Sequence, residues 1–244
     1  MRGVIGAVAA LLVLGVGLPA RGNWPAYRGD ATRSGVAKTQ LPAAVVLQWT
    51  YGTLPPQPAW PKPARSSYWQ QLSHIEPRVV DDHAFHPVIG DDAVYFGSSA
   101  DDQIHCLDLF TGEVRWTFFT DGPVRFAPVL AGDRLYFGSD DGHIYCISAG
   151  DGQLIWKHRV GPSDRLISGN GRMISIWPVR TGLVVDGGVV YTTAGLFPSQ
   201  GVWACALRAD DGEVIWKHEL GDYSPQGYII ASPDMLYVPT GRSN

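Results

Sequence analysis

The sequence predicts an all-β fold, a β-propeller segment of four-stranded antiparallel blades, and three observations support this. A cassette of short strand-like runs and turns recurs at roughly 40 residues, as between Trp116 and Trp156, a period typical of propeller blades. Pro-Val-Arg opens it at residues 123–125 and again at 178–180. The 29 glycines, 18 prolines and nine tryptophans fit an all-β protein with many turns. We expect three blades plus a partial fourth, an incomplete ring.

Residues 1–20 have the composition of a signal peptide or an N-terminal anchor. Arg2 precedes an uncharged apolar run at 3–18, and Ala20 offers a cleavage point. The run is short for a membrane span of roughly 20 residues, but Leu18 is an unfavourable residue two positions before Ala20. Both interpretations stay open, and both predict export to the periplasm or cell envelope. We expect no further transmembrane segment.

Residues 21–80 form a lead segment before the repeats. Its strand-like run at 45–51 contains Trp49 and resembles the outer strand that would close a last blade contributed from beyond Asn244. The proline-rich stretch at 55–63 predicts an extended linker. On this interpretation the chain is the N-terminal part of a larger ring.

The repeats occupy residues 81–244, as cassettes at about 81–118, 123–158 and 178–218 and a partial one at 225–244. The second cassette predicts strands at 125–131, 134–139, 143–148 and 153–158, separated by glycine- and aspartate-containing turns. Equivalent strands are expected at 93–98, 104–108, 189–193, 202–208 and 236–238. The glycine-rich connection at 159–178 is unusually long, and long loops tend to be functional or disordered; we slightly favour function.

Acidic and histidine pairs in the cassettes do not predict a metal site. Asp101-Asp102 and Asp140-Asp141 occupy hairpin turns, where aspartate is favoured for backbone reasons, so we expect them to be solvated. His83 and His86 have a spacing that metals sometimes use. They would point to opposite faces of an extended strand.

The three cysteines are expected to be free, buried thiols. Cys106 and Cys146 occupy the same repeat position, which Ala206 fills in the third cassette, so the site is a small strand position. Equivalent positions on neighbouring blades should lie beyond the ~7 Å Cα limit for a disulfide. Cys205 is one residue out of step and should face the other way.

Two arginines form the candidate ligand site. Arg125 and Arg180 share one repeat position on the first strands, which line a propeller channel, and Gln226 is their counterpart in the fourth cassette. Paired guanidiniums suit carboxylates and other planar anions. The alternative is that each arginine pairs with a neighbouring acid, such as Asp121 or Asp164.

The turns of the cassettes resemble those of the PQQ-like (pyrroloquinoline-quinone) repeat. Each turn joins Thr-Gly or Asp-Gly to an outer strand that ends in tryptophan, at residues 111–116, 151–156 and 211–216. Trp24-Pro25-Ala26-Tyr27-Arg28-Gly29-Asp30 is similar to the segment that precedes the first blade in such proteins. The resemblance implies the quinoprotein alcohol dehydrogenase-like propeller fold, with the glycine making the turn and the tryptophan packing between blades.

The resemblance implies two kinds of function. Quinoprotein dehydrogenases hold pyrroloquinoline quinone and Ca²⁺ in the channel of an eight-bladed ring, and many have a vicinal Cys-Cys disulfide, a pair that this sequence lacks. The other branch resembles a propeller lipoprotein of the outer-membrane assembly machinery, which binds partner proteins without a cofactor.

We therefore expect an exported binding or scaffold module at the cell envelope, with no catalytic residue and no assigned cofactor or metal. Its partners would be envelope proteins or an anionic small molecule in the channel. The formal net charge of −4 argues against nucleic acid. One alternative is the N-terminal part of a PQQ-dependent oxidoreductase, with the quinone and Ca²⁺ as cofactors; another is a truncated non-functional fragment.

Overall fold

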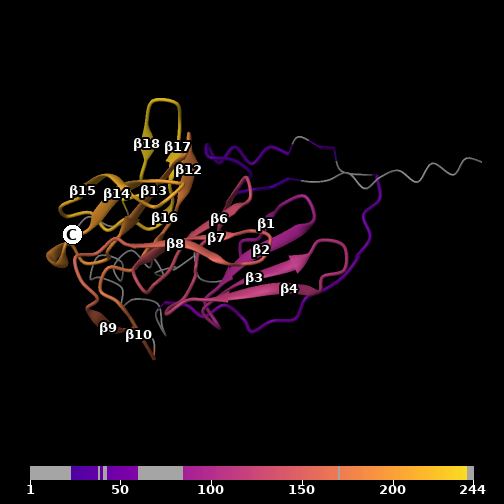
Figure 1. The fold of residues 1–244 in the computed structure, drawn as a ribbon, viewed down its shortest axis with the longest axis horizontal. Coiled ribbons are helices and arrows are strands. Elements are labelled where there is room, and N and C mark those ends of the chain that lie inside the picture. The colour runs from indigo at the N-terminus through magenta and orange to yellow at the C-terminus, as the bar shows by residue number, and fades with distance from the viewer. Residues whose placement is uncertain (1–22, 38, 41–42, 60–84, 170, 241–244) are drawn as a thin grey trace, which may run out of the picture.

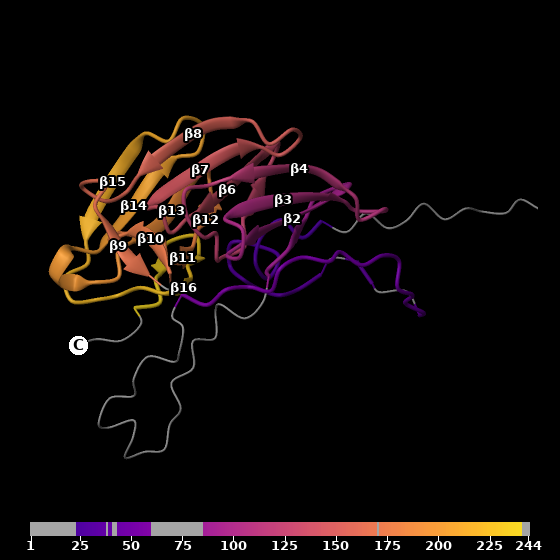
Figure 2. The same ribbon diagram turned by 90° about the horizontal axis from the view of Figure 1, so that it is seen from below.

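The computed structural model describes residues 23–37, 39–40, 43–59, 85–169 and 171–240, and these form three blades set side by side along an arc (Figures 1 and 2). Each blade is a four-stranded antiparallel sheet with its strands in chain order, which confirms the predicted fold class. The strands of the blades are β1 (Val88–Ile89), β2 (Ala93–Ser98), β3 (Gln103–Asp108) and β4 (Val114–Phe119); β5 (Val129–Ala131), β6 (Arg134–Gly138), β7 (His143–Ser148) and β8 (Leu154–Arg159); and β12 (Val184–Asp186), β13 (Val189–Ala194), β14 (Trp203–Arg208) and β15 (Val214–Glu219).

The remaining elements are short and lie between or after the blades. The connection at 159–178 contains a hairpin of β9 (Leu166–Gly169) and β10 (Arg172–Ser175), so its described part is ordered. The partial fourth repeat supplies β16 (Gly227–Tyr228), which pairs in parallel with β11 (Thr181–Gly182), and a hairpin of β17 (Ile230–Ala231) and β18 (Leu236–Tyr237). Among the described residues, the single helical element is the 3-10 turn η1 (Pro198–Gln200). No helix in the described ranges is long and apolar enough to cross a membrane.

The first strand of the second blade is shorter than predicted. It starts at Val129 rather than at Arg125, because Pro128 has no N–H and the Ala127 N–H donates to the hydroxyl of Tyr228 at 2.9 Å. Residues 45–51 make no strand pairing with the described chain. The blade that they are predicted to close would come from beyond Asn244, so their role as a closing strand stays a prediction. The predicted signal peptide or anchor, His83 and the end of the proline-rich linker lie outside the described residues.

The hydrophobic cores lie between neighbouring blades. The second blade shows why: Leu135, Phe137 and Ile147 pack toward the first blade, whereas Tyr136 and Ile144 pack toward the third. Side chains alternate between the two faces of a strand, so both faces of an inner strand are buried and its sequence is apolar throughout. The outer strands β4, β8 and β15 lie on the convex side of the arc, where most of their residues are exposed (Figure 2).

One contact joins each blade to the next. A tryptophan in the outer strand, or Trp49 ahead of the first blade, covers the glycine of the following blade's last turn, and its indole N–H donates to a backbone carbonyl beside that turn. Where the blade supplies it, a tyrosine hydroxyl donates to the same carbonyl. Trp49 covers Gly112 and donates to the Leu109 carbonyl. Trp116 covers Gly152, and Trp116 and Tyr95 both donate to the Ala149 carbonyl. Trp156 covers Gly212, and Trp156 and Tyr136 both donate to the Ala209 carbonyl.

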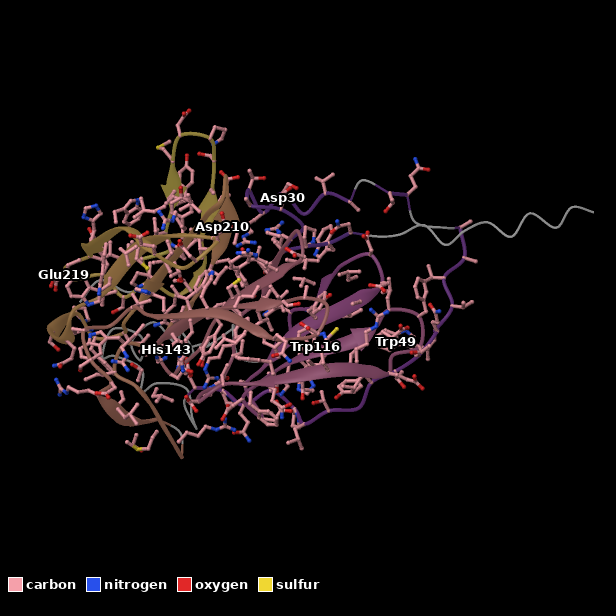
Figure 3. The ribbon with its side chains drawn as sticks, in the orientation of Figure 1. Asp30, Trp49, Trp116, His143, Asp210 and Glu219 are labelled. Carbon is pink, nitrogen blue, oxygen red and sulfur yellow. The ribbon has the colours of Figure 1, made fainter. Side chains whose placement is uncertain are left out.

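Trp49 therefore occupies the place of a blade tryptophan although its segment is unpaired. Its Nε1 lies 2.9 Å from the carbonyl oxygen of Leu109, matching the 2.9 Å between Trp156 Nε1 and the Ala209 oxygen. Figure 3 labels Trp49 and Trp116. The contact is that of a blade tryptophan, whereas the closing of a further blade by residues 45–51 stays a prediction.

The lead segment ties the successive blades together on the concave side of the arc (Figure 2). Trp24 bridges Ile89 of the first blade, and the Leu130 N–H of the second donates to the Pro25 carbonyl at 2.8 Å. The buried Arg33 guanidinium donates to Leu183 O at 2.8 Å, next to the third blade, and its Nε donates to the carbonyl of Ile229 in the fourth repeat at 3.1 Å. One short stretch of chain thus contacts all four repeats.

Candidate functional site

The two arginines of the predicted site converge on one carboxylate, that of Asp140. Arg180 donates through Nε to Oδ1 at 2.5 Å and through Nη2 to Oδ2 at 2.9 Å. Arg125 Nε lies 2.7 Å from Oδ2. The partner is thus Asp140, rather than Asp121 or Asp164, and superposing the cassettes had brought the arginines together without identifying the acid between them.

Asp140 is fully buried, at 0% exposure, which corrects the expectation that it is solvated. It belongs to the turn between β6 and β7, which is held on two sides: its N–H donates to Pro123 O at 2.9 Å, and its carbonyl accepts from the Ser175 N–H at 2.8 Å. A carboxylate out of water is costly unless paired and hydrogen-bonded, and the two guanidiniums meet that need. The cluster of Arg125, Asp140 and Arg180 carries a formal charge of +1.

Gln226 does not join this cluster. It precedes β16, whose pairing with β11 begins one residue after Arg180, so the two residues are neighbours in register. The Gln226 side chain is exposed, and within the described residues no hydrogen bond links it to either arginine. Its backbone N–H donates to the carbonyl of Pro239 at 3.3 Å.

A hydrogen-bonded pair of an aspartate and an aromatic or imidazole ring lies at equivalent positions in the first two blades. His105 Nε2 lies 3.0 Å from Asp101 Oδ2, and in the next blade the hydroxyl of Tyr145 donates to Asp141 Oδ2 at 2.5 Å. These pairs were not predicted from the sequence, because aspartates in hairpin turns are also favoured for backbone reasons. The signal was available: in each pair the ring follows the aspartate by four residues.

The charge states of the second pair are set by burial and by hydrogen bonding. Burial alone would raise the pKa of Asp141, but hydrogen bonds from His143 and Tyr145 lower it below its usual value. Burial and the neighbouring Asp141 raise the pKa of Tyr145 well above its usual range. Tyr145 therefore stays a neutral donor to an ionised carboxylate.

The lead segment reaches this side of the blades at Gln57. Arg125 Nη1 donates to the Gln57 carbonyl at 2.6 Å, Ser99 Oγ accepts from its N–H at 2.9 Å, and Arg172 Nη2 donates to its Oε1 at 3.2 Å. Arg172 also forms an ion pair with Asp102. The sequence analysis did not identify Gln57, Ser99 or Arg172.

The cysteines are free and buried, as predicted. Cys106 and Cys146 occupy equivalent positions in the first and second blades. Each is paired with a tyrosine on one neighbouring strand and with a tryptophan on the other. Burial raises the thiol pKa to about 12 in Cys106, about 11 in Cys146 and about 12 in Cys205. The thiols therefore stay protonated near neutral pH, and a reactive thiolate is disfavoured.

The described residues do not fit the quinone and calcium pair that the fold family implies. Both channel arginines already bond to Asp140, and Arg125 also bonds to Gln57. No three His, Cys, Asp or Glu side chains in the described ranges come together as a metal-binding group. We derive no step through either cofactor.

Comparisons with known proteins agree with the fold. The model of the family described as outer membrane protein assembly factor BamB matches residues 62–227. The assembly factor BamB of Yersinia pestis is 28% identical over 140 residues, which cover 55% of this chain and 33% of that protein. A polyvinylalcohol dehydrogenase of a Pseudomonas species is 26% identical over 136 residues, covering 54% of this chain and 19% of that protein.

Among solved structures, the quinohemoprotein alcohol dehydrogenase of Comamonas testosteroni superposes with a TM-score of 0.57 at 17% identity, covering 81% of this chain and 27% of that one. At that identity the likeness shows the propeller fold alone. The chain spans only a third or less of the curated relatives it matches. The family match covers well over half of the chain and confirms the resemblance inferred from its turns: the chain belongs to the family of PQQ-like repeat propellers described as outer membrane protein assembly factor BamB.

Proposed function

We propose that this chain is an exported binding or scaffold module of the cell envelope, and that its partners are proteins engaged in outer membrane protein assembly. The observation that carries the proposal is the state of the channel arginines. Arg125 and Arg180 are engaged by Asp140 and by the Gln57 carbonyl, so the groups that would bind a quinone are used within the protein. The family match and the BamB relatives support the choice of partners.

The test is a deletion of the gene in its own organism. We expect the tagged chain in the periplasmic or envelope fraction and a lower amount of outer membrane proteins in the deletion strain, restored by the wild-type gene. A cytoplasmic tag, or unchanged outer membrane proteins, would contradict the proposal.

The competing hypothesis is that the chain is part of a quinoprotein oxidoreductase, and the similarity to a polyvinylalcohol dehydrogenase favours it. Titration of the purified chain with pyrroloquinoline quinone and Ca²⁺ separates the two hypotheses. We expect no saturable change in quinone absorbance, and a stoichiometric change would favour the oxidoreductase.

A further inference from the structure

Gln57 is bound at three polar groups by three different parts of the fold. Its N–H donates to Ser99 Oγ, directly after β2. Its carbonyl accepts from Arg125, in the connection before β5, and its side-chain Oε1 accepts from Arg172 of β10. A single residue of the lead segment thus connects the first blade, the second blade and the inserted hairpin.

The groups that bind Gln57 are held in place without it. Arg125 is bonded to the buried Asp140. Arg172 is paired with Asp102, and its Nη2 also donates to the Ala100 carbonyl at 2.7 Å. Ser99 is buried at 5% exposure. Such a set of donors and acceptors is preorganised, so a ligand would not have to order them on binding.

Residues 55–59 lie against these groups in the manner of a bound peptide, not of a sheet strand. Residues 43–57 make no backbone-to-backbone hydrogen bond with the described chain. Prolines at 55, 56 and 58 favour an extended polyproline-type backbone. Gln57 itself is exposed, so its side chain can leave without opening a core, whereas Ala59 at the end of the stretch is buried at 3% exposure and anchors it.

We propose that Ser99, Arg125 and Arg172 form a binding site for an extended peptide of another protein, and that residues 55–59 occupy this site within the chain. The ligand class is a proline-flanked segment with glutamate at the position of Gln57. The present bond from Arg172 to an amide oxygen is long, at 3.2 Å. The Arg172 guanidinium already makes this bond charge-assisted, and a carboxylate in place of the amide would add the attraction of opposite charges and could accept from the guanidinium through both oxygens.

This site deepens the proposed binding function and rests on it for the source of the peptide. Peptide binding is measured on the purified chain, whereas the proposed function is measured on a deletion strain. The peptide-site proposal can therefore be contradicted while the proposed envelope function is supported, and the reverse outcome is equally distinguishable.

The experiment uses three fluorescent hexapeptides that copy residues 54–59, with Glu, Gln or Ala at the fourth position, titrated by anisotropy into the full chain. The Gln57→Ala variant loosens the internal segment. We expect it to bind the Glu peptide saturably, and about five- to tenfold more tightly than the Ala peptide. The wild-type chain should bind the Glu peptide more weakly, because its own segment competes.

Arg172→Met in the Gln57→Ala background should abolish the preference for Glu. The matched control is Arg165→Met in the same background, since Arg165 lies in the same connection but bonds Gln200, not Gln57. It should keep the preference. Absence of saturable binding to a folded Gln57→Ala chain, or equal affinity for the Glu and Ala peptides, would overturn the proposal.

A third variant decides the question if Gln57→Ala does not fold. Gln57→Glu places the preferred side chain in the internal segment and should weaken binding of the free Glu peptide relative to wild type. Equal binding by the two chains would show that residues 55–59 do not occupy a ligand site.

Discussion

At the scale of single residues, Asp140 has the largest structural consequence. Its carboxylate is inaccessible to solvent and accepts three charge-assisted hydrogen bonds from Arg125 and Arg180. The net contribution of such a group is small while both partners are present, because burial offsets the attraction. Removal of one partner leaves a buried charge that is incompletely compensated.

Arg180→Met should therefore lower the free energy of unfolding by about 3 kcal/mol, measured by urea denaturation at pH 7. Arg208→Met is the matched control, because Arg208 pairs with Asp211 and Glu213 at the surface. It should change stability little. Equal losses in the two variants would mean that the Asp140 cluster is effectively solvated.

The hydrogen bond from Tyr145 to Asp141 gives stability a specific dependence on pH. The pKa of Asp141 is lower in the folded chain than its usual 3.8. The ionised carboxylate therefore contributes to the free energy of unfolding above about pH 4, and this contribution is lost as the pH falls through the folded pKa. The stability difference between wild type and Tyr145→Phe should be full at pH 7 and shrink below about pH 4.

Tyr136→Phe is the control for that experiment. The Tyr136 hydroxyl donates to the uncharged Ala209 carbonyl at 3.1 Å, so the cost of its removal should not change between pH 7 and pH 3. Urea titrations at several pH values measure both variants. A Tyr145→Phe difference that stays constant to pH 3 would show that Asp141 is not the titrating partner.

At the scale of elements, the contact between a blade tryptophan and the next turn joins the sheets. Trp156 is 8% exposed, covers Gly212 and donates to the Ala209 carbonyl. Trp216 lies at the equivalent position of β15 in the third blade. Its indole N–H has no carbonyl acceptor among the described residues, and it lines a cavity of about 340 Å³ with residues 231–236.

Trp156→Ala should cost about 4 kcal/mol in unfolding free energy. Trp216→Ala should cost at least about 1 kcal/mol less, because no interblade hydrogen bond is lost. Chemical denaturation of the two variants under identical conditions makes the comparison. A larger loss for Trp216→Ala would mean that the repeated contact is not what joins the blades.

Two turn glycines allow the two reasons for a glycine to be measured separately: a left-handed backbone conformation, and a lack of space for a side chain. Gly212 has a φ of +75°, and an added Cβ would lie 2.7 Å from the ring of Trp156; Gly187 has a φ of +54° with nothing within 4 Å. Gly187→Ala should cost about 1 kcal/mol from the backbone alone. Gly212→Ala should cost about 3 kcal/mol, since the added methyl also displaces the tryptophan. Equal costs, from denaturant midpoints and slopes, would exclude the steric component.

At the scale of the whole molecule, the sequence predicted what is local and periodic. Alternating apolar strands and glycine turns identified the blades, and aligned cassettes placed Arg125 and Arg180 near one another because equivalent residues of adjacent blades face a common axis. The acid between them was not predicted, since an aspartate in a turn looks the same whether it is solvated or buried. Contacts such as that of Arg33 with Leu183, which spans 150 positions, depend on how the blades are placed and leave no local pattern.

Arg33 shows how such a long-range contact holds the arc together. Burial lowers its pKa, yet arginine remains charged, and its donors are satisfied by backbone carbonyls of the lead segment, the approach to the third blade and the fourth repeat. Loss of this side chain should release the lead segment while the sheets remain folded, because each sheet is paired within its own blade.

In Arg33→Met, the amides of Leu130 and Ala231, which donate to carbonyls of the lead segment, should exchange hydrogen for deuterium faster than in wild type. Amides of β6 and β7, bonded within the second blade, should keep their protection. Arg28→Met is the control, since Arg28 lies in the same segment with an exposed side chain. Faster exchange throughout the second blade would mean that the lead segment and the blades unfold as one unit, and that the arc depends on its inner segment for the stability of each sheet.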